Sequence, residues 1–103
     1  MHAQVQPPPQ PEDHGRTPQE RLSTRPIRAL HRGLDVLIEL NRRERAAINT
    51  LAGAVHLPRT TTYRILETLR AAGYVDRDPH DDCYRPTVRV RALSDGFDDE
   101  AMV

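Results

Sequence analysis

Apolar side chains recur at helical spacing from residue 26 to residue 42 of this 103-residue chain. They are Ile27, Leu30, Leu34, Leu37 and Ile38. Steps of three or four residues place such side chains on one face of a helix. Thr24 is a candidate N-cap, and a first helical turn tolerates Pro26. We therefore expect a first helix over residues 26–42, with this apolar stripe turned toward the core.

A break at residues 43–47 precedes a second, shorter helical pattern over residues 50–55. Ile48 is a candidate for a single-residue strand stub, and Asn49 is the candidate N-cap of the second helix. Leu51, Ala52 and Val55 then face inward. The sequence His56-Leu57-Pro58 predicts a tight turn directly after this helix.

A third helix is expected over residues 58–72, beginning at Pro58 and ending at the C-cap residue Gly73. Its buried stripe consists of Thr62, Ile65, Leu66 and Leu69. The opposite side carries polar and charged residues, namely Arg59, Thr60, Tyr63, Arg64 and Glu67.

A β-hairpin is expected after the third helix. Residues 74–77 form its first strand, residues 78–82 have turn composition, and residues 83–88 form the return strand. Pro86 cannot donate a hydrogen bond to a ladder, so the return strand lies at an edge or stops early. Apolar positions 88, 90, 93 and 97 then predict the start of a linker helix over residues 89–103, which we expect to be truncated.

This order predicts a mainly α fold with a small β-hairpin, a winged helix-turn-helix over residues 25–88. Residues 1–24 are rich in proline and poor in apolar side chains, so we expect a disordered tail. No apolar run has the length of a membrane span, and we expect a cytoplasmic protein. Cys83 is the single cysteine and the five histidines are scattered. We therefore expect neither a metal site nor a cofactor.

A net charge of zero conceals an uneven distribution. Residues 25–75 hold nine arginines against four acidic residues, a formal charge of +5, whereas residues 76–103 have a formal charge of −4. A basic middle segment is typical of nucleic-acid binding. In this fold the third helix enters the major groove, where arginine grips phosphates or guanine edges and hydroxyls bind phosphates.

The sequence LAGAVHLPRTTTYRILETL at residues 51–69, followed by AGYV at 72–75, resembles the reader domain of IclR-type transcription regulators. The sequence YRPTVRVRALSDGFDDE at residues 84–100 resembles the MhpR-like subgroup, which activates aromatic-acid degradation genes. The resemblance implies sequence-specific binding of double-stranded DNA through Arg59, Thr60, Thr61, Tyr63 and Arg64. It also implies wing contacts near Arg77 and Arg85. Three positions depart from the family pattern: Gly53, His56 and Thr62.

In the family a ligand-sensing domain follows the reader, and we expect that domain, and any small-molecule ligand, to be absent from this chain. We accordingly expect a monomer or a weak homodimer. A winged-helix protein-interaction module without DNA binding is the alternative. An enzyme is not expected, because Cys83 with His80, or Asp81 with Asp82, lacks a third orienting group.

Overall fold

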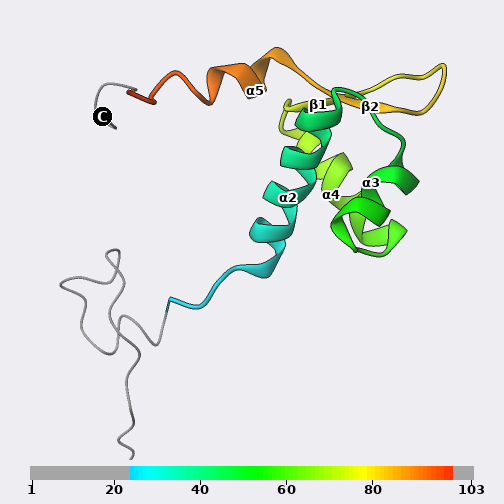
Figure 1. Ribbon diagram of the computed structural model, residues 1–103, viewed down its shortest axis with the longest axis horizontal. Helices are drawn as coiled ribbons and strands as arrows, with labels where there is room; N and C mark the ends of the chain where they lie inside the picture. The colour runs from blue at the N-terminus through cyan, green and yellow to red at the C-terminus, as the bar shows by residue number, and fades with distance from the viewer. Residues whose placement is uncertain (1–23, 99–103) are drawn as a thin grey trace, which may run out of the picture.

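The computed structural model describes residues 24–98, and within them it shows four helices and one two-stranded antiparallel hairpin (Figure 1). The expected proline-rich tail and the last residues of the linker helix lie outside this range, apart from Thr24. Three helices pack together, the hairpin forms the wing, and α5 extends from the wing away from the helices. In chain order the elements are α2 (Arg28–Arg43), α3 (Ile48–Val55), α4 (Arg59–Ala71), β1 (Val75–Arg77), β2 (Tyr84–Pro86) and α5 (Val88–Ala92).

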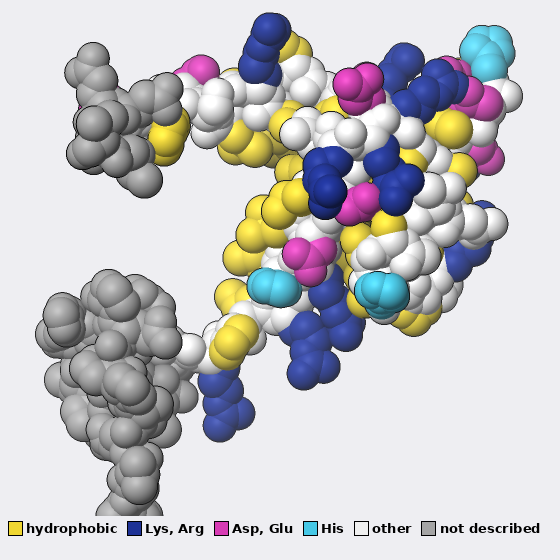
Figure 2. All heavy atoms as spheres, viewed as in Figure 1, with side chains coloured by type: hydrophobic (Ala, Val, Ile, Leu, Met, Phe, Trp, Pro, Cys, Tyr) yellow, Lys and Arg dark blue, Asp and Glu magenta, His cyan; other side chains and the backbone are white. Residues whose placement is uncertain are grey.

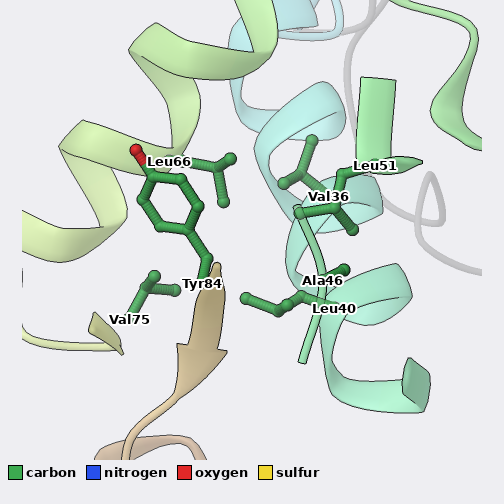
Figure 3. Packing of buried hydrophobic residues seen from close by; sticks show 7 residues of the cluster. All are labelled: Val36, Leu40, Ala46, Leu51, Leu66, Val75 and Tyr84. Atoms are coloured by element: carbon green, nitrogen blue, oxygen red, sulfur yellow. The ribbon is translucent and has the colours of Figure 1, made fainter. Parts of the chain in front are cut away.

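The core of this winged helix-turn-helix is small and draws on every element except α5 (Figure 3). Tyr84 is 1% exposed and is the largest of the fully buried side chains. Its ring lies between Leu66 of α4 and Val75 of β1, with the hydroxyl pointing toward α4. The other members of the cluster are Val36, Leu40, Ala46 and Leu51. The wing is therefore anchored in the same core that orders the three helices.

Helix α2 is present as expected, but its predicted facing is wrong. Val36 and Leu40 are fully buried, whereas Ile27, Leu30, Leu34 and Ile38 are at least half exposed. Leu37 lies between the two stripes and packs against the core. Both stripes satisfy helical periodicity. The shorter one packs into the core, whereas Leu30 and Leu34 of the longer one stay half exposed at the groove between α2 and α4.

The start of α2 also differs from the expectation. The helix begins at Arg28, and its N-cap position is Ile27, which makes no side-chain capping bond. Thr24 lies three residues before the N-cap, so the expectation that it caps the helix is wrong.

The strand stub before α3 lies two residues earlier than expected. Ala46, not Ile48, pairs with Tyr84 through two backbone hydrogen bonds of 3.0 and 2.8 Å. Ile48 is the first residue of α3, whose N-cap is Ala47. Asn49 therefore lies inside the helix instead of capping it. The short Ala46 side chain is buried against the core, which allows the chain to pass close to the wing.

Helix α4 has the facing that the sequence predicts. Thr62 and Leu66 are fully buried, and Ile65 and Leu69 pack against the core. The Thr62 hydroxyl donates to the carbonyl oxygen of Pro58 at 3.0 Å, which satisfies the one buried polar side chain among residues 24–98. These interactions fix which face of α4 turns outward.

Gly73 ends α4 in the left-handed conformation, with a φ of 92°. Its N–H donates to Arg70 at 3.0 Å, and the Tyr74 N–H donates to Leu69 at 2.9 Å. This pair of bonds is the Schellman motif, in which glycine avoids the steric cost of a side chain. The chain thereby reverses directly into β1.

His56 ends α3 with a φ of 57° and a ψ of 45°, in the left-handed region. This confirms the tight turn expected directly after the helix. A residue with a Cβ is strained there, and the exposed imidazole has no side-chain hydrogen bond in the described part of the chain.

Replacing His56 with glycine is expected to leave stability unchanged or raise it by up to about 1 kcal/mol, because relief of the strain outweighs the added unfolded-state entropy. Urea titrations of wild type, His56→Gly and His56→Ala check this. Alanine keeps the strain, so it should not stabilise. A clear loss of stability with glycine would show that the imidazole makes a native contact.

The wing pairs Val75 with Pro86 and Arg77 with Tyr84 in antiparallel register. Its return strand ends at Pro86, earlier than the expected end at residue 88, because proline cannot extend the ladder. Thr87 then caps α5, its hydroxyl accepting the Arg89 N–H at 3.2 Å. Of the linker helix expected over residues 89–103, the described residues contain only α5, which begins at Val88 and ends at Ala92, so the expectation of a helix is wrong for residues 93–98. None of the helices in residues 24–98 is long and apolar enough to cross a membrane.

Candidate nucleic-acid interface

The outer face of α4 presents four of the seven sequence-predicted site residues together. Arg59, Thr60, Tyr63 and Arg64 are all exposed, whereas Thr62 between them is fully buried. Burial of Thr62 and Leu66 requires residues near position 64 to face away from the core. The helix therefore offers two guanidinium groups and two hydroxyls to solvent along its first two turns.

Arg59 is oriented by the preceding helix. Its Nε donates to Asn49 Oδ1 at 2.9 Å, a bond that joins the start of α4 to α3 across the turn. The amide is neutral, so this bond fixes the side chain without cancelling its charge. The sequence suggests Asn49 only as a helix cap, and its position next to Arg59 becomes evident in the fold.

The guanidinium of Arg64 makes neither a hydrogen bond nor an ion pair within residues 24–98; only its backbone carbonyl is engaged, accepting the Thr68 hydroxyl at 2.7 Å. Thr61, in contrast, is half-buried on the side of α4 next to α2. Of the expected recognition residues, Thr61 is therefore the one that the fold places at the edge of the outer face.

Arg77 is held by carboxylates within the wing. Its Nε lies 3.0 Å from Asp82 Oδ1, its Nη1 lies 3.9 Å from Glu67 Oε2, and its guanidinium lies over the Tyr84 ring. The hydrogen bond to Asp82 contributes most to raising the pKa of Arg77. Arg85 is exposed on β2 and has no ion pair within residues 24–98. The two expected wing residues therefore differ: Arg85 is available, and Arg77 is engaged.

The tip of the wing is acidic, and its polar groups maintain the turn. Asp78 and Asp81 accept the backbone N–H groups of His80 and Cys83 at 2.9 and 3.0 Å. Arg45, from the segment after α2, forms ion pairs with both aspartates. The residues considered as enzyme candidates are thus elements of a turn, and no group of three metal-ligating side chains gathers in the described residues.

Glu67 links α4 to the wing, an interaction that the sequence does not suggest. The Tyr84 hydroxyl donates to Glu67 Oε2 at 2.8 Å, and Arg70 Nη1 lies 3.0 Å from Oε1. The expectation that Glu67 belongs to the outer face of α4 is wrong, because its side chain is half-buried and turns toward β2. The hydrogen bond from Tyr84 contributes most to holding the pKa of Glu67 below its usual value of 4.5. The hydrogen bond and positive charge of Arg70, and the positive charge of Arg77, lower this pKa further. Burial, and then Glu67 itself, raises the pKa of Tyr84 to about 12.

The Glu67–Tyr84 pair is expected to make stability pH-dependent. Because the pKa of Glu67 is lower in the folded chain, its contribution is present above pH 4.5 and is lost as the pH falls below that value. Because the pKa of Tyr84 is raised from 10.0 to about 12, stability also falls as the pH rises through that window.

Urea titrations between about pH 3 and pH 7 check the acid limb, using Glu67→Gln as the comparison. The variant keeps the shape and an acceptor oxygen but does not titrate, so its acid limb should be flatter than that of the wild type. Parallel acid limbs for the two proteins would contradict the assignment to Glu67.

Comparison with known proteins agrees with this geometry. The family model of the IclR helix-turn-helix domain matches residues 29–79. An IclR family transcriptional regulator from Brucella abortus superposes with a TM-score of 0.66 at 25% identity, over 76% of this chain and 30% of that protein. A putative transcriptional regulator from Rhodococcus sp. RHA1 gives a TM-score of 0.63 at 33% identity, over 70% of this chain and 28% of that protein.

A third solved structure shares the fold alone. The Zalpha domain of Cyprinid herpesvirus 3, solved for its binding mode to Z-DNA, superposes with a TM-score of 0.55 at 21% identity over its full length. The matched part of this chain spans 30% and 28% of the length of the two regulators. Residues 29–79, with the wing that completes them, form a winged helix-turn-helix DNA-binding domain of the IclR family of transcriptional regulators.

Proposed function

We propose that this chain is a sequence-specific reader of double-stranded DNA in transcription regulation. The observation that carries the proposal is Arg64, which is exposed, unpaired within the described residues and held on the outer face of α4 by the buried Thr62 and Leu66. An unpaired arginine on a helix that fits the major groove can form a bidentate contact with guanine.

The neighbouring side chains have distinct roles in this proposal. Arg59, steadied by Asn49, grips a phosphate at the start of α4. Thr60 and Tyr63 donate hydroxyls to the phosphate backbone beside it. Thr61 supports the packing of α4 on α2, and its contact with DNA is peripheral in this proposal.

In the wing, we propose a phosphate contact for Arg85 and a structural role for Arg77. Arg77 would have to leave Asp82 and Glu67 to reach DNA, and Asp82 would then lose its hydrogen-bonded partner. Because the ligand is chromosomal DNA, we also propose a cytoplasmic location. The assignment to the MhpR-like subgroup rests on the sequence of residues 84–100 and is part of the same proposal.

Selection of bound duplexes from a randomised library tests sequence specificity. The reader is expected to enrich a defined sequence and to prefer it over a scrambled duplex in fluorescence anisotropy near physiological salt. The rival function, a protein-interaction module, predicts no enriched sequence and no binding at that salt.

We further propose weak self-association through the exposed stripe of α2 against a second copy of the chain. Ile27, Leu30, Leu34 and Ile38 are 67, 60, 50 and 55% exposed. Figure 2 shows hydrophobic side chains running along this edge of α2 and on to the underside of α5. A patch of one helix face is smaller than the roughly 800 Å² per partner of a stable interface, so the dimer should be weak.

Sedimentation velocity at several concentrations is expected to show a monomer at low micromolar concentration and a dimer only above it. Leu34→Glu should remove the association and leave the melting temperature nearly unchanged, since the side chain is half exposed. A tight dimer at nanomolar concentration, or association that survives Leu34→Glu, would contradict weak self-association through this stripe.

Aromatic acids should not shift DNA affinity, because we propose that this chain binds no small-molecule effector.

A further inference from the structure

The arginines of the described residues divide into two groups, those that are neutralised by acids and those that are not. Arg42 and Arg43, at the end of α2, lie 3.7 and 2.7 Å from oxygens of Glu39. Arg45, Arg70 and Arg77 likewise face carboxylates. Arg28 and Arg32, in the first two turns of the same α2, have no acidic partner and no side-chain hydrogen bond within residues 24–98.

The unpaired arginines of α2 lie on the flank next to the outer face of α4. Arg32 and Arg64 line the same groove between α2 and α4, together with Thr61 and Thr68. No acidic side chain of the described residues lines that groove. Arg28 precedes Arg32 by four residues and so lies on the same side of α2, one turn nearer the N-terminus. In Figure 2 the arginine side chains gather below the lower end of α2, beside α4.

The wing, which packs against α4 through β1 and against α2 through β2, is acidic at its tip. There the wing carries Asp78, Asp81 and Asp82, which occupy Arg45 and Arg77. Only Arg85 of the wing strands is without an acidic partner in the described residues. Two phosphate strands border the major groove, one on each side of an inserted helix. The difference in charge between α2 and the wing therefore sets how strongly the domain binds each of the two strands.

We propose that Arg28 and Arg32 bind the phosphate strand beside the groove that α4 enters, so that α2, more than the wing, holds this domain on DNA. The inference rests on the proposed function, because it assigns further contacts to the same DNA complex. Long guanidinium side chains suit this role, since phosphate contacts set orientation and register without reading sequence.

The test uses the full chain and measures affinity for one duplex across a series of salt concentrations. Arg28→Ala/Arg32→Ala is expected to reduce the steepness of the negative slope of log affinity against log salt by about 1.8, close to 0.9 for each phosphate that the variant no longer neutralises. The affinity should fall equally on enriched and scrambled duplexes, because these phosphate contacts carry no sequence information. Arg32→Lys keeps the positive charge, so its salt slope should stay near that of the wild type.

Arg42→Ala is the matched control, an exposed arginine of the same helix that pairs with Glu39. It should leave the slope near that of the wild type. A double variant with the wild-type slope, or a control whose slope falls as far as that of the double variant, would overturn the inference. Arg64→Ala distinguishes failure of this inference from failure of the proposed function. If only the role of Arg28 and Arg32 is wrong, Arg64→Ala still weakens DNA binding. A wild-type chain that binds no DNA overturns the inference and the proposed function together.

The salt slope is compared only between folded proteins, confirmed by circular dichroism. If the double variant does not fold, the wild-type chain is titrated with duplexes carrying neutral methylphosphonate linkages on the strand beside α2. Weaker binding than to duplexes neutralised on the wing side supports the inference, and equal or stronger binding overturns it.

Discussion

Replacing Tyr84 with alanine is expected to destabilise the domain by about 3–5 kcal/mol, enough to unfold much of a small domain. Tyr84 is 1% exposed and contributes the largest side chain of the core. Its backbone also pairs with Ala46, and its hydroxyl holds Glu67. One residue of the wing therefore ties together the helices and the hairpin, and the cavity left by its ring has no other side chain to fill it.

Chemical denaturation followed by circular dichroism measures this destabilisation, with Tyr84→Phe as the control. Phenylalanine keeps the ring and removes the single hydrogen bond to Glu67, so it should cost about 1 kcal/mol. A destabilisation by alanine no larger than that by phenylalanine would mean that the ring is not part of the core.

Replacing Arg64 with alanine is expected to weaken DNA binding by about 1–3 kcal/mol, roughly five- to 150-fold, with little change in melting temperature. Its side chain is exposed and makes no hydrogen bond or ion pair within residues 24–98, so its removal costs the fold no such interaction.

Anisotropy titrations on the enriched duplex and thermal melts of the same samples measure the two effects. Arg70→Ala serves as a matched control from the last turn of α4, where the arginine pairs with Glu67. If Arg64→Ala binds as the wild type does, or melts several degrees lower, then Arg64 is a structural residue and the outer face of α4 is not the reading surface.

The order of three helices and a hairpin could be predicted because several of the boundaries have a local cause. Gly73 takes a positive φ, Pro58 precedes the first turn of α4, and Pro86 ends the return strand. The facing of α4 could be predicted as well, because its apolar positions form a single stripe. The positive φ of His56 and the bond from Thr62 to Pro58 follow from the same local chemistry.

The facing of α2 could not be predicted from periodicity alone, because two apolar stripes share Leu37. Only the tertiary arrangement selects Val36 and Leu40 for the core and leaves Leu34 exposed. The exposed stripe is the feature that supports a second copy of the chain as a partner.

The ion-pair and hydrogen-bond partners of the charged residues could not be predicted from the sequence either. Glu67 and Tyr84 are 17 positions apart, and Arg45 meets Asp81 only when the wing folds back on the segment after α2. Such contacts depend on topology, whereas spacing along the chain reports only neighbours on one element. For that reason the sequence predicts Arg77 as a DNA contact, and the structure shows it engaged by Asp82 and Glu67.

An NMR titration of the labelled chain with its enriched duplex locates the DNA-binding surface residue by residue. The largest chemical-shift changes are expected on the backbone of residues 59–64 and on the side-chain Nε–H groups of Arg59 and Arg64. Smaller changes are expected at Arg85 and on the first turns of α2. Changes confined to the exposed apolar stripe of α2, or no changes at near-physiological salt, would contradict a DNA reader that acts through the outer face of α4.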